Sequence, residues 1–305
     1  MSRKGTGRRG RQVARHDFAK VTSAGSIPAL ASSRPTRQCQ PLVNSALAIR
    51  RPRFGPPEKS ETARLLTPLD LLADQSPHLW FRPLVGKDAT GQPFELPRYY
   101  FVGPQPAGGE RMAKLALFAG IHGDELEGTL ALWRLLSELE AKPAAAAGCV
   151  LYCYPVCNPS GLEKGTRLSD SGKDLDQEFW RNSTEPEVRL LESELRARWF
   201  DGIVSLHSHR ATSRCFGLIN GDMVSERLLE AALDGAEDSL PCLRLRNGER
   251  RFLAPGMLQA PPDSGVRPFE VALVAPRKVP IHLQVEGMAA ALGKLLAEYR
   301  RLCRL

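Results

Sequence analysis

The sequence predicts an α/β fold in which helices cover both faces of a central sheet that is mixed but mostly parallel, a three-layer α/β/α arrangement. Two apolar runs, 115–119 and 202–206, show no polar alternation, which is typical of strands buried on both faces. Windows with helical spacing of apolar residues, such as 128–141, lie between such runs. Buried strands that alternate with amphipathic helices indicate this fold class.

From Leu65 onward, this alternation gives an ordered set of predicted elements. Strands are expected at 115–119, 150–156, 202–206 and 268–274, and helices at 128–141, 185–200, 225–233 and 283–301. Thr184 is a candidate N-cap for the helix at 185–200, with Glu187 completing a capping box. The stretch 235–264 is rich in Pro, Gly and Arg, so we expect loops or small antiparallel strands there.

The positive charge of the chain is confined to its N-terminal part. The net charge is +8, yet residues 1–59 hold 13 Lys or Arg against two acids, whereas residues 60–305 hold 29 basic and 32 acidic side chains. Residues 1–60 show no helical or strand period and are predicted to be a disordered basic extension. Residues 61–305 are predicted to form one globular domain, whose mildly acidic balance does not favour nucleic-acid binding outside the tail.

Three origins fit the basic extension. Its composition, rich in Arg and Ser and poor in acids, fits a mitochondrial transit peptide, and it also fits a basic arm that binds nucleic acid. Alternatively, the sequence at 24–28 resembles the translated T-arm of a bacterial tRNA gene, which would make the extension a misplaced start.

Cysteine usage predicts a reducing, cytoplasmic compartment, with mitochondria as the alternative if the extension is a transit peptide. The seven cysteines cannot all pair and none forms a CxxC motif, so we expect reduced thiols. No apolar window approaches the roughly 20 residues of a membrane-spanning helix. We therefore do not expect a membrane protein of the helical kind.

Polar residues with metal-binding chemistry follow the predicted strands. His122 and Glu125 follow the strand at 115–119, and His207 follows the strand at 202–206. Ligands of open α/β sheets bind beyond the carboxyl ends of the strands, so these three side chains are expected to meet. Two His and one Glu leave a fourth zinc position open, which is the ligand set of a catalytic site. We therefore expect one Zn²⁺ per chain.

These residues resemble the zinc carboxypeptidase superfamily, in particular its short branch that includes succinylglutamate desuccinylase and aspartoacylase. The resemblance covers about 115–301. Its markers occur in order as Gly120-Ile121-His122-Gly123-Asp124-Glu125, Asn158-Pro159-Ser160-Gly161, Thr166-Arg167, Asp174-Leu175, Leu206-His207 and Phe269-Glu270. It implies the carboxypeptidase-like fold for the domain at 61–305.

The resemblance also implies roles for individual residues. His122, Glu125 and His207 bind zinc, and Asp174 supports His122 by accepting a hydrogen bond from its other ring nitrogen. Arg167 polarises the scissile carbonyl, and Glu270 acts as general base and acid. The implied activity is hydrolysis of an amide bond, as a carboxypeptidase or an N-acyl amino acid deacylase, on a small peptide or an N-acyl amino acid.

The sequence departs from the family pattern directly after Asp174-Leu175. The family usually has an Asn-Arg pair that holds the substrate's carboxylate, and this chain has Asp176-Gln177. A neutral Gln cannot replace a bidentate guanidinium. Either another cation does this task, with Arg181, Arg210 and Arg214 as candidates, or the substrate has no carboxylate there.

The altered pair also supports an alternative function. The chain could be a catalytically impaired relative that still binds zinc or a ligand on the same fold. A third alternative is a nucleic-acid binder that acts through the basic tail alone. The sequence gives no indication of the oligomeric state or of the substrate's identity.

Overall fold

The computed structural model describes residues 60–305, apart from residues 89, 107–108, 110, 245–250 and 266. The predicted disorder of residues 1–60 and the three origins of the extension concern residues outside this described part, except for Ser60. The described residues all belong to one compact unit, residues 52–305. Among them, no helix combines the length and apolar character that crossing a bilayer requires.

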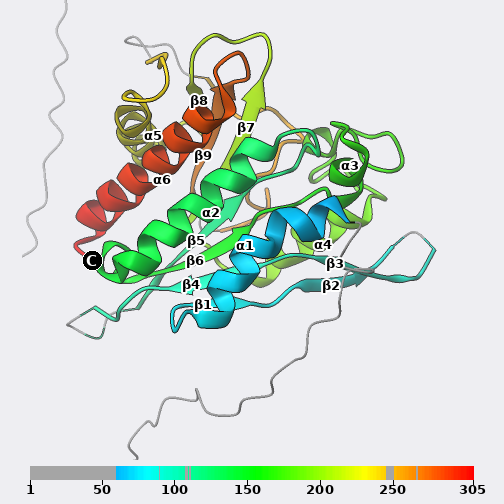
Figure 1. Ribbon diagram of the computed structural model, residues 1–305, viewed down its shortest axis with the longest axis horizontal. Helices are drawn as coiled ribbons and strands as arrows, with labels where there is room; N and C mark the ends of the chain where they lie inside the picture. The colour runs from blue at the N-terminus through cyan, green and yellow to red at the C-terminus, as the bar shows by residue number, and fades with distance from the viewer. Residues whose placement is uncertain (1–59, 89, 107–108, 110, 245–250, 266) are drawn as a thin grey trace, which may run out of the picture. The chain divides into compact units, whose positions relative to one another are not determined.

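A seven-stranded mixed sheet forms the centre of this unit (Figure 1). Its strand order is β1-β4-β6-β5-β7-β9-β8. Strands β6, β5, β7 and β9 are parallel neighbours, and the antiparallel strands lie at the two edges. The strands are β1 (Leu79–Phe81), β4 (Tyr99–Val102), β5 (Ala113–Phe118), β6 (Cys149–Tyr154), β7 (Gly202–His209), β8 (Phe216–Ile219) and β9 (Phe269–Pro276).

One face of the sheet is covered by four helices. Figure 1 shows α2 and α6 lying across this face, with α1 and α5 to either side. Their apolar side chains pack with those of the strands into one continuous core cluster. These helices are α1 (Glu61–Gln75), α2 (Leu126–Ala141), α5 (Met223–Ala236) and α6 (Ile281–Cys303).

The other face is covered by α4 (Pro186–Ala197) and by a two-stranded sheet made of β2 (Leu84–Lys87) and β3 (Pro93–Leu96). Apolar side chains of α4 pack on Phe118 and Ile203, and Leu84 and Leu96 complete this second core cluster. Three short helices lie in the connections between these elements, namely η1 (Pro143–Ala146), α3 (Pro159–Lys164) and η2 (Leu175–Gln177). The predicted α/β/α fold with a mostly parallel sheet is confirmed.

Most of the predicted elements are present with small shifts of their ends. The predicted N-cap of α4 is wrong, because Glu185 occupies that position and its side chain makes no capping hydrogen bond. The sequence analysis also missed the helix α1 and the strands β1 to β4. These strands are short and show no clear alternation of polar and apolar residues. The stretch 235–264 contains only the end of α5 and isolated bridges among its described residues, as expected for loops.

Candidate metal centre

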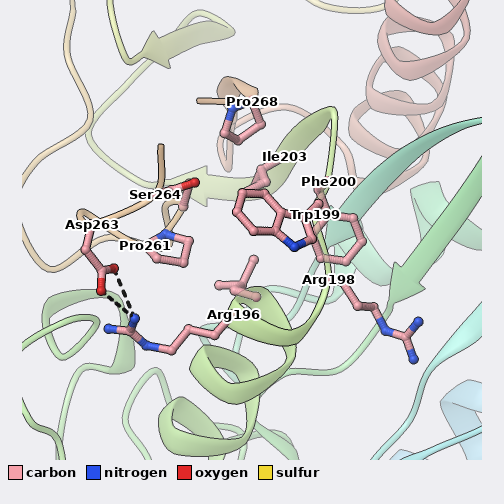
Figure 2. A pocket seen from close by; sticks show the side chains of 11 residues that line it. Arg196, Arg198, Trp199, Phe200, Ile203, Pro261, Asp263, Ser264 and Pro268 are labelled. Atoms are coloured by element: carbon pink, nitrogen blue, oxygen red, sulfur yellow. Dashed lines mark hydrogen bonds and ion pairs between the residues drawn. The ribbon is translucent and has the colours of Figure 1, made fainter. Parts of the chain in front are cut away.

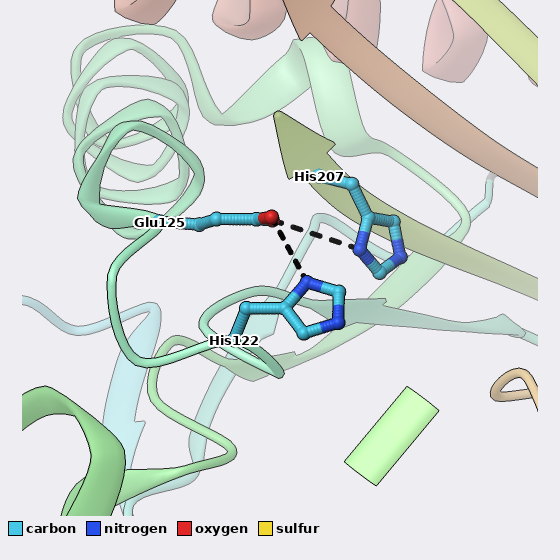
Figure 3. Close-up of side chains that lie close together, drawn as sticks. All are labelled: His122, Glu125 and His207. Carbon is cyan, nitrogen blue, oxygen red and sulfur yellow. Dashed lines mark hydrogen bonds and ion pairs between the residues drawn. The ribbon is translucent and has the colours of Figure 1, made fainter. Parts of the chain in front are cut away.

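Three predicted ligands converge at the carboxyl ends of β5 and β7. His122 and Glu125 lie in the loop that joins β5 to α2, and His207 lies near the end of β7. Glu125 Oε1 is 2.9 Å from His122 Nδ1, and Glu125 Oε2 is 3.7 Å from His207 Nδ1. Figure 3 shows the three side chains pointing toward one another. One ligand atom from each lies within 4.8 Å of the others, which is the spacing that a metal ion would bridge.

The loop reaches this geometry because glycine occupies two demanding positions. Gly120 has φ of 63°, a left-handed conformation that residues with a Cβ seldom adopt. Gly123 packs directly on the backbone of α3, where an added Cβ would lie 2.1 Å from the carbonyl carbon of Gly161. The loop can therefore turn tightly between strand and helix and direct His122 and Glu125 inward.

The second nitrogen of each imidazole is held by a neighbouring side chain. His122 Nε2 lies 3.0 Å from Asp174 Oδ1, and His207 Nε2 lies 3.0 Å from Ser205 Oγ. The backbone N–H of Ser208 donates to Glu125 Oε2 at 3.0 Å. These contacts fix both rings with Nδ1 facing Glu125, as the outer contacts of a metal site usually do. Sequence reasoning missed Ser205, although its position two residues before His207 on one strand places both side chains on the same face.

The charges at this centre favour a cation. Burial lowers the pKa of His122, but hydrogen bonds to Asp174 and Glu125 outweigh it and raise that pKa to about 9. Burial by itself would raise the pKa of the Glu125 and Asp174 carboxyls. Their contact with His122 outweighs burial, so the pKa of each is lowered. Without a metal, a protonated imidazole thus sits between two carboxylates. Buried His and Glu donors that already hold one positive charge fit a divalent ion such as zinc.

Arg167 lies at the edge of this centre. Its Nη1 is 3.3 Å from Glu125 Oε1, and its Nε is 3.1 Å from Asp174 Oδ2. The guanidinium therefore contacts one predicted ligand and the side chain that supports another. Its half-exposed position lets it face both the buried centre and the adjacent cavity.

A cavity of about 350 Å³ adjoins the centre. It is lined by Arg167, Asp174, Asp176, Gln177, Arg181, Ala254, Pro255 and Met257. The last three belong to the irregular stretch, which packs on the segment after η2 through a hydrogen bond from Phe179 N–H to the Gly256 carbonyl at 3.0 Å. Most of the predicted substrate-side residues therefore line one cavity.

Asp176 and Gln177 have different environments within this cavity. Asp176 is buried, and its Oδ1 accepts a hydrogen bond from Leu258 N–H at 3.3 Å. Burial raises the pKa of Asp176, while electrostatic interactions with His207 and His122 oppose that rise. Gln177 Nε2 donates to Asp174 Oδ2 at 3.3 Å, so this side chain is joined to the support of His122.

The three candidate cations are distributed differently. Arg181 lines the cavity and donates from Nη2 to the Pro255 carbonyl at 3.0 Å. Arg210 and Arg214 do not line it. Arg210 instead lines a separate cavity with Glu127, Arg277, Lys278, Ile281 and Gln284. Arg210 therefore does not share a cavity with Asp176, and its role in substrate binding stays a prediction.

The predicted general base, Glu270, is not at the metal centre. It is the second residue of β9 and pairs with Ile203, whereas His207 pairs with Val274 four residues further along. At about 3.3 Å per residue, that is a separation of about 13 Å along the strand. The Glu270 carboxylate accepts a hydrogen bond from Ala260 N–H, and burial raises its pKa. The register of β9 against β7 places the apolar Val274 beside His207, so this geometry gives no support to the prediction that Glu270 is the general base.

Glu270 instead neighbours a second cavity, of about 190 Å³ (Figure 2). Ile203 and Ala260, its strand neighbour and its hydrogen-bond donor, both line this cavity. Trp199, Phe200 and two prolines supply apolar surface, and Arg196 pairs with Asp263 at its edge at 2.9 Å. None of the three converging metal ligands lines it.

Comparison with known proteins supports the family predicted from the sequence. Residues 111–236 match the succinylglutamate desuccinylase/aspartoacylase catalytic domain. The predicted resemblance to this family is confirmed over these residues. The matched region includes His122, Glu125, Arg167 and His207, and it ends before Glu270. No functionally curated protein is significantly similar to the chain in sequence.

Solved structures share the fold at low sequence identity. A metallo-carboxypeptidase from Burkholderia cenocepacia is 17% identical, with a TM-score of 0.64, and the match covers 80% of this chain and 70% of that one. A metallo-carboxypeptidase from Pseudomonas aeruginosa, in complex with (2-guanidinoethylmercapto)succinic acid, is 18% identical with a TM-score of 0.57 and covers 79% and 68%. Bovine thrombin-activatable fibrinolysis inhibitor is 15% identical with a TM-score of 0.56 and covers 79% and 96%.

Proposed function

We propose that this chain is a zinc-dependent hydrolase that cleaves an amide bond in a short peptide or an N-acyl amino acid. The convergence of His122, Glu125 and His207 beside a cavity carries the proposal. Bound there, zinc would supply Lewis-acid chemistry, polarising a carbonyl and lowering the pKa of water. Asp174 and Ser205 would orient the two imidazoles, and one ion would be held per chain.

Arg167 and Asp176 are the side chains that we assign to the reaction. Arg167 reaches the edge of the centre, where its guanidinium would stabilise negative charge on the carbonyl oxygen. Glu270 is too distant to move a proton there. Asp176 is buried in the cavity, and burial raises its pKa, which suits a carboxylate that accepts a proton and returns it to the leaving amine.

Arg181 is the side chain that we assign to substrate recognition. Gln177 carries no charge, and Arg167 is engaged with Glu125 and Asp174. Arg181 lines the same cavity and is exposed, with one hydrogen bond to the Pro255 carbonyl and an electrostatic interaction with Glu178. A substrate carboxylate would therefore pair with Arg181.

A second candidate function is metal or ligand binding without turnover. Two observations favour it. Val274, an aliphatic residue, occupies the β9 position that pairs with His207, and Asp176-Gln177 replaces the family's Asn-Arg pair. On this alternative, the centre holds zinc and the cavity holds a ligand that is not cleaved.

Metal content and hydrolysis together separate the two functions. Purified full-length protein is analysed by inductively coupled plasma mass spectrometry beside a His122→Ala, His207→Ala variant, with the exposed His282→Ala as the matched control. About one zinc per chain, absent only from the double variant, is expected. Absence of zinc from folded, zinc-supplemented protein would contradict both functions.

The zinc-loaded protein is then assayed on N-acyl amino acids and short peptides. Turnover that falls at least ~100-fold in Asp176→Asn and persists in Glu270→Gln supports the hydrolase and its assigned proton acceptor. Zinc binding without any turnover supports the second candidate instead.

We also propose that the protein is cytoplasmic. Cytoplasmic placement is supported by the cysteines, since the six that the structure describes are all free thiols. The mitochondrial alternative depends on the extension at 1–60, and sequencing the mature N-terminus tests it.

A further inference from the structure

Cys215 and Cys242 lie side by side although 26 residues separate them. Cys215 precedes β8, and Cys242 follows α5. They form an isolated parallel bridge. Cys215 N–H donates to the Pro241 carbonyl at 2.7 Å, and Leu243 N–H donates to the Cys215 carbonyl at 2.7 Å. Two strong backbone hydrogen bonds therefore hold the pair in register from both sides.

The two thiols are in contact and differ in their access to solvent. Each thiol shifts the pKa of the other, and Cys242 Sγ also donates to the Leu233 and Leu240 carbonyls at 3.5 and 3.4 Å. Cys215 is 1% exposed, whereas Cys242 is only partly buried. The Cys215 thiol lowers the pKa of Cys242 despite the opposing effect of burial. Cys242 is thus the accessible, more readily ionised member of the pair, and Cys215 is a buried partner within its reach.

The backbone geometry suits a disulfide. Neighbouring strands lie about 4.8 Å apart, within the roughly 4.4–6.8 Å range of Cα separations that disulfides require. Paired residues of a bridge direct their Cβ atoms to the same side, so both thiols lie on one side of the bridge.

The other described cysteines lack these features. Burial raises the pKa of Cys149 to about 12 and also raises the pKa of Cys153 and Cys157. Cys303 is exposed, near the end of α6. Within the described part of the chain, only Cys215 and Cys242 form a pair of thiols that each shift the pKa of the other.

We propose that Cys215 and Cys242 are a redox modification site that forms a reversible disulfide with a low-molecular-weight disulfide such as oxidised glutathione. The Cys242 thiolate attacks one sulfur of the small disulfide, giving a mixed disulfide and one small thiolate, which takes up the proton that Cys242 lost. The Cys215 sulfur then attacks Cys242 Sγ, and its proton passes to the second small thiolate as that group leaves. Two protein thiols are oxidised to one disulfide, and one small disulfide is reduced to two thiols.

The crosslink would tie the segment that follows β7, the strand of His207, to the segment that follows α5. Residues 210–214 connect His209, the last residue of β7, to Cys215. The disulfide would close a loop that contains β8 and α5 and would fix the far end of the 210–214 connection. The inference does not rest on the proposed hydrolase, since it uses none of the residues of the metal centre.

Disulfide mapping on the full-length protein tests the proposal. The protein is incubated with oxidised glutathione, quenched with acid, alkylated with N-ethylmaleimide under denaturing conditions and digested for mass spectrometry. We expect one linked peptide pair that joins Cys215 to Cys242, the loss of two alkylated cysteines per chain, and their return after dithiothreitol.

Matched variants identify the two steps. Cys215→Ser is expected to stop at a glutathione adduct on Cys242, while Cys303→Ser leaves the disulfide unchanged. The wild-type result needs no variant to fold. A glutathione adduct that persists on Cys242 in the wild type, a disulfide from either cysteine to another one, or two thiols that stay alkylatable would each overturn the proposal.

Discussion

At the residue scale, the metal centre depends on how each imidazole is held. Asp174 and Glu125 contact opposite nitrogens of His122, so the ring has a single orientation with Nδ1 toward the other ligands. Ser205, two residues earlier on the same face of β7, contacts Nε2 of His207 and so orients that ring. Because the acceptors come from separate segments, the ligand geometry depends on the loop at 174–177 as well as on the ligands themselves.

We predict that Asp174→Ala lowers zinc affinity by about 10–100-fold, because His122 loses the acceptor that fixes its tautomer and orientation. Competition titration with a chromophoric chelator measures this change. Asp263→Ala is the matched control, since that exposed carboxylate pairs with Arg196 away from the centre. Equal affinities in the two variants would contradict the supporting role of Asp174.

Glu270→Gln has a different expected outcome. Its buried carboxylate accepts hydrogen bonds from Ala260 N–H and the Asn220 side chain, so the substitution should reduce the free energy of unfolding by about 1–2 kcal/mol. The zinc content should stay unchanged, because Glu270 pairs with Ile203, four residues before His207 along β7. Urea denaturation and metal analysis test both parts, and loss of zinc would show that Glu270 does act at the centre.

At the element scale, the turn between β5 and α2 is positioned by its contact with α3. Gly123 packs on the backbone of Gly161 and Leu162, and backbone atoms cannot rotate away as a flexible side chain does. The Asn158 side chain accepts from Gly161 N–H at 2.8 Å and so caps α3 at this contact. The two family markers at 120–125 and 158–161 are thus two sides of one packing contact.

Gly123→Ala is therefore expected to destabilise the fold by about 1–3 kcal/mol and to weaken zinc binding, because the new Cβ forces the loop away from α3. Gly293→Ala is the control: it lies in α6 with nothing within 4 Å of the added Cβ, so it should be neutral or stabilise by up to about 1 kcal/mol. Thermal melting with and without zinc compares them. A stable Gly123→Ala variant with full zinc affinity would show that the loop adapts.

Single elements were predicted well where a local pattern of apolar residues specifies them. Their ends were predicted poorly where pairing with a neighbouring strand sets them. The buried strands β5, β6, β7 and β9 were recognised because runs without polar alternation have few other structures open to them. The ends were less well predicted, since β7 continues through His207 to His209 and β9 continues to Pro276. The register between β7 and β9, which the sequence pattern does not give, sets the distance of Glu270 from His207 along the sheet.

At the scale of the whole molecule, protonation and metal binding are linked through His122. Its folded pKa, about 9, lies above the ordinary value of 6.5. The protonated ring therefore stabilises the metal-free protein fully below about pH 6.5, and this contribution is lost as the pH rises through about 9. Metal binding requires the neutral ring, so the affinity for the metal increases as the pH rises.

We expect zinc affinity to rise about tenfold per pH unit between pH 6.5 and 8.5, because one proton must leave His122 for each ion bound. Over the same interval, the metal-free protein should lose about 1–3 kcal/mol of stability from this group, while the zinc-loaded protein should not. Isothermal titration calorimetry in buffers of different ionisation enthalpy gives the proton count. The His122→Ala variant should lose most of the pH dependence of metal-free stability.

The amino-acid sequence alone predicts the fold class, the family resemblance, the three candidate ligands and the likeness to a hydrolase, because these depend on local apolar runs and on motifs spaced within short segments. The tertiary structure is needed to show which distant residues share a cavity. It brought Asp176, Gln177 and Arg181 to Arg167, separated Arg210 and Glu270 from them, and placed Cys215 beside Cys242. Strand register sets the separation of Glu270 from His207, and the packing of distant loops sets the other distances; neither follows from the order of residues in one segment.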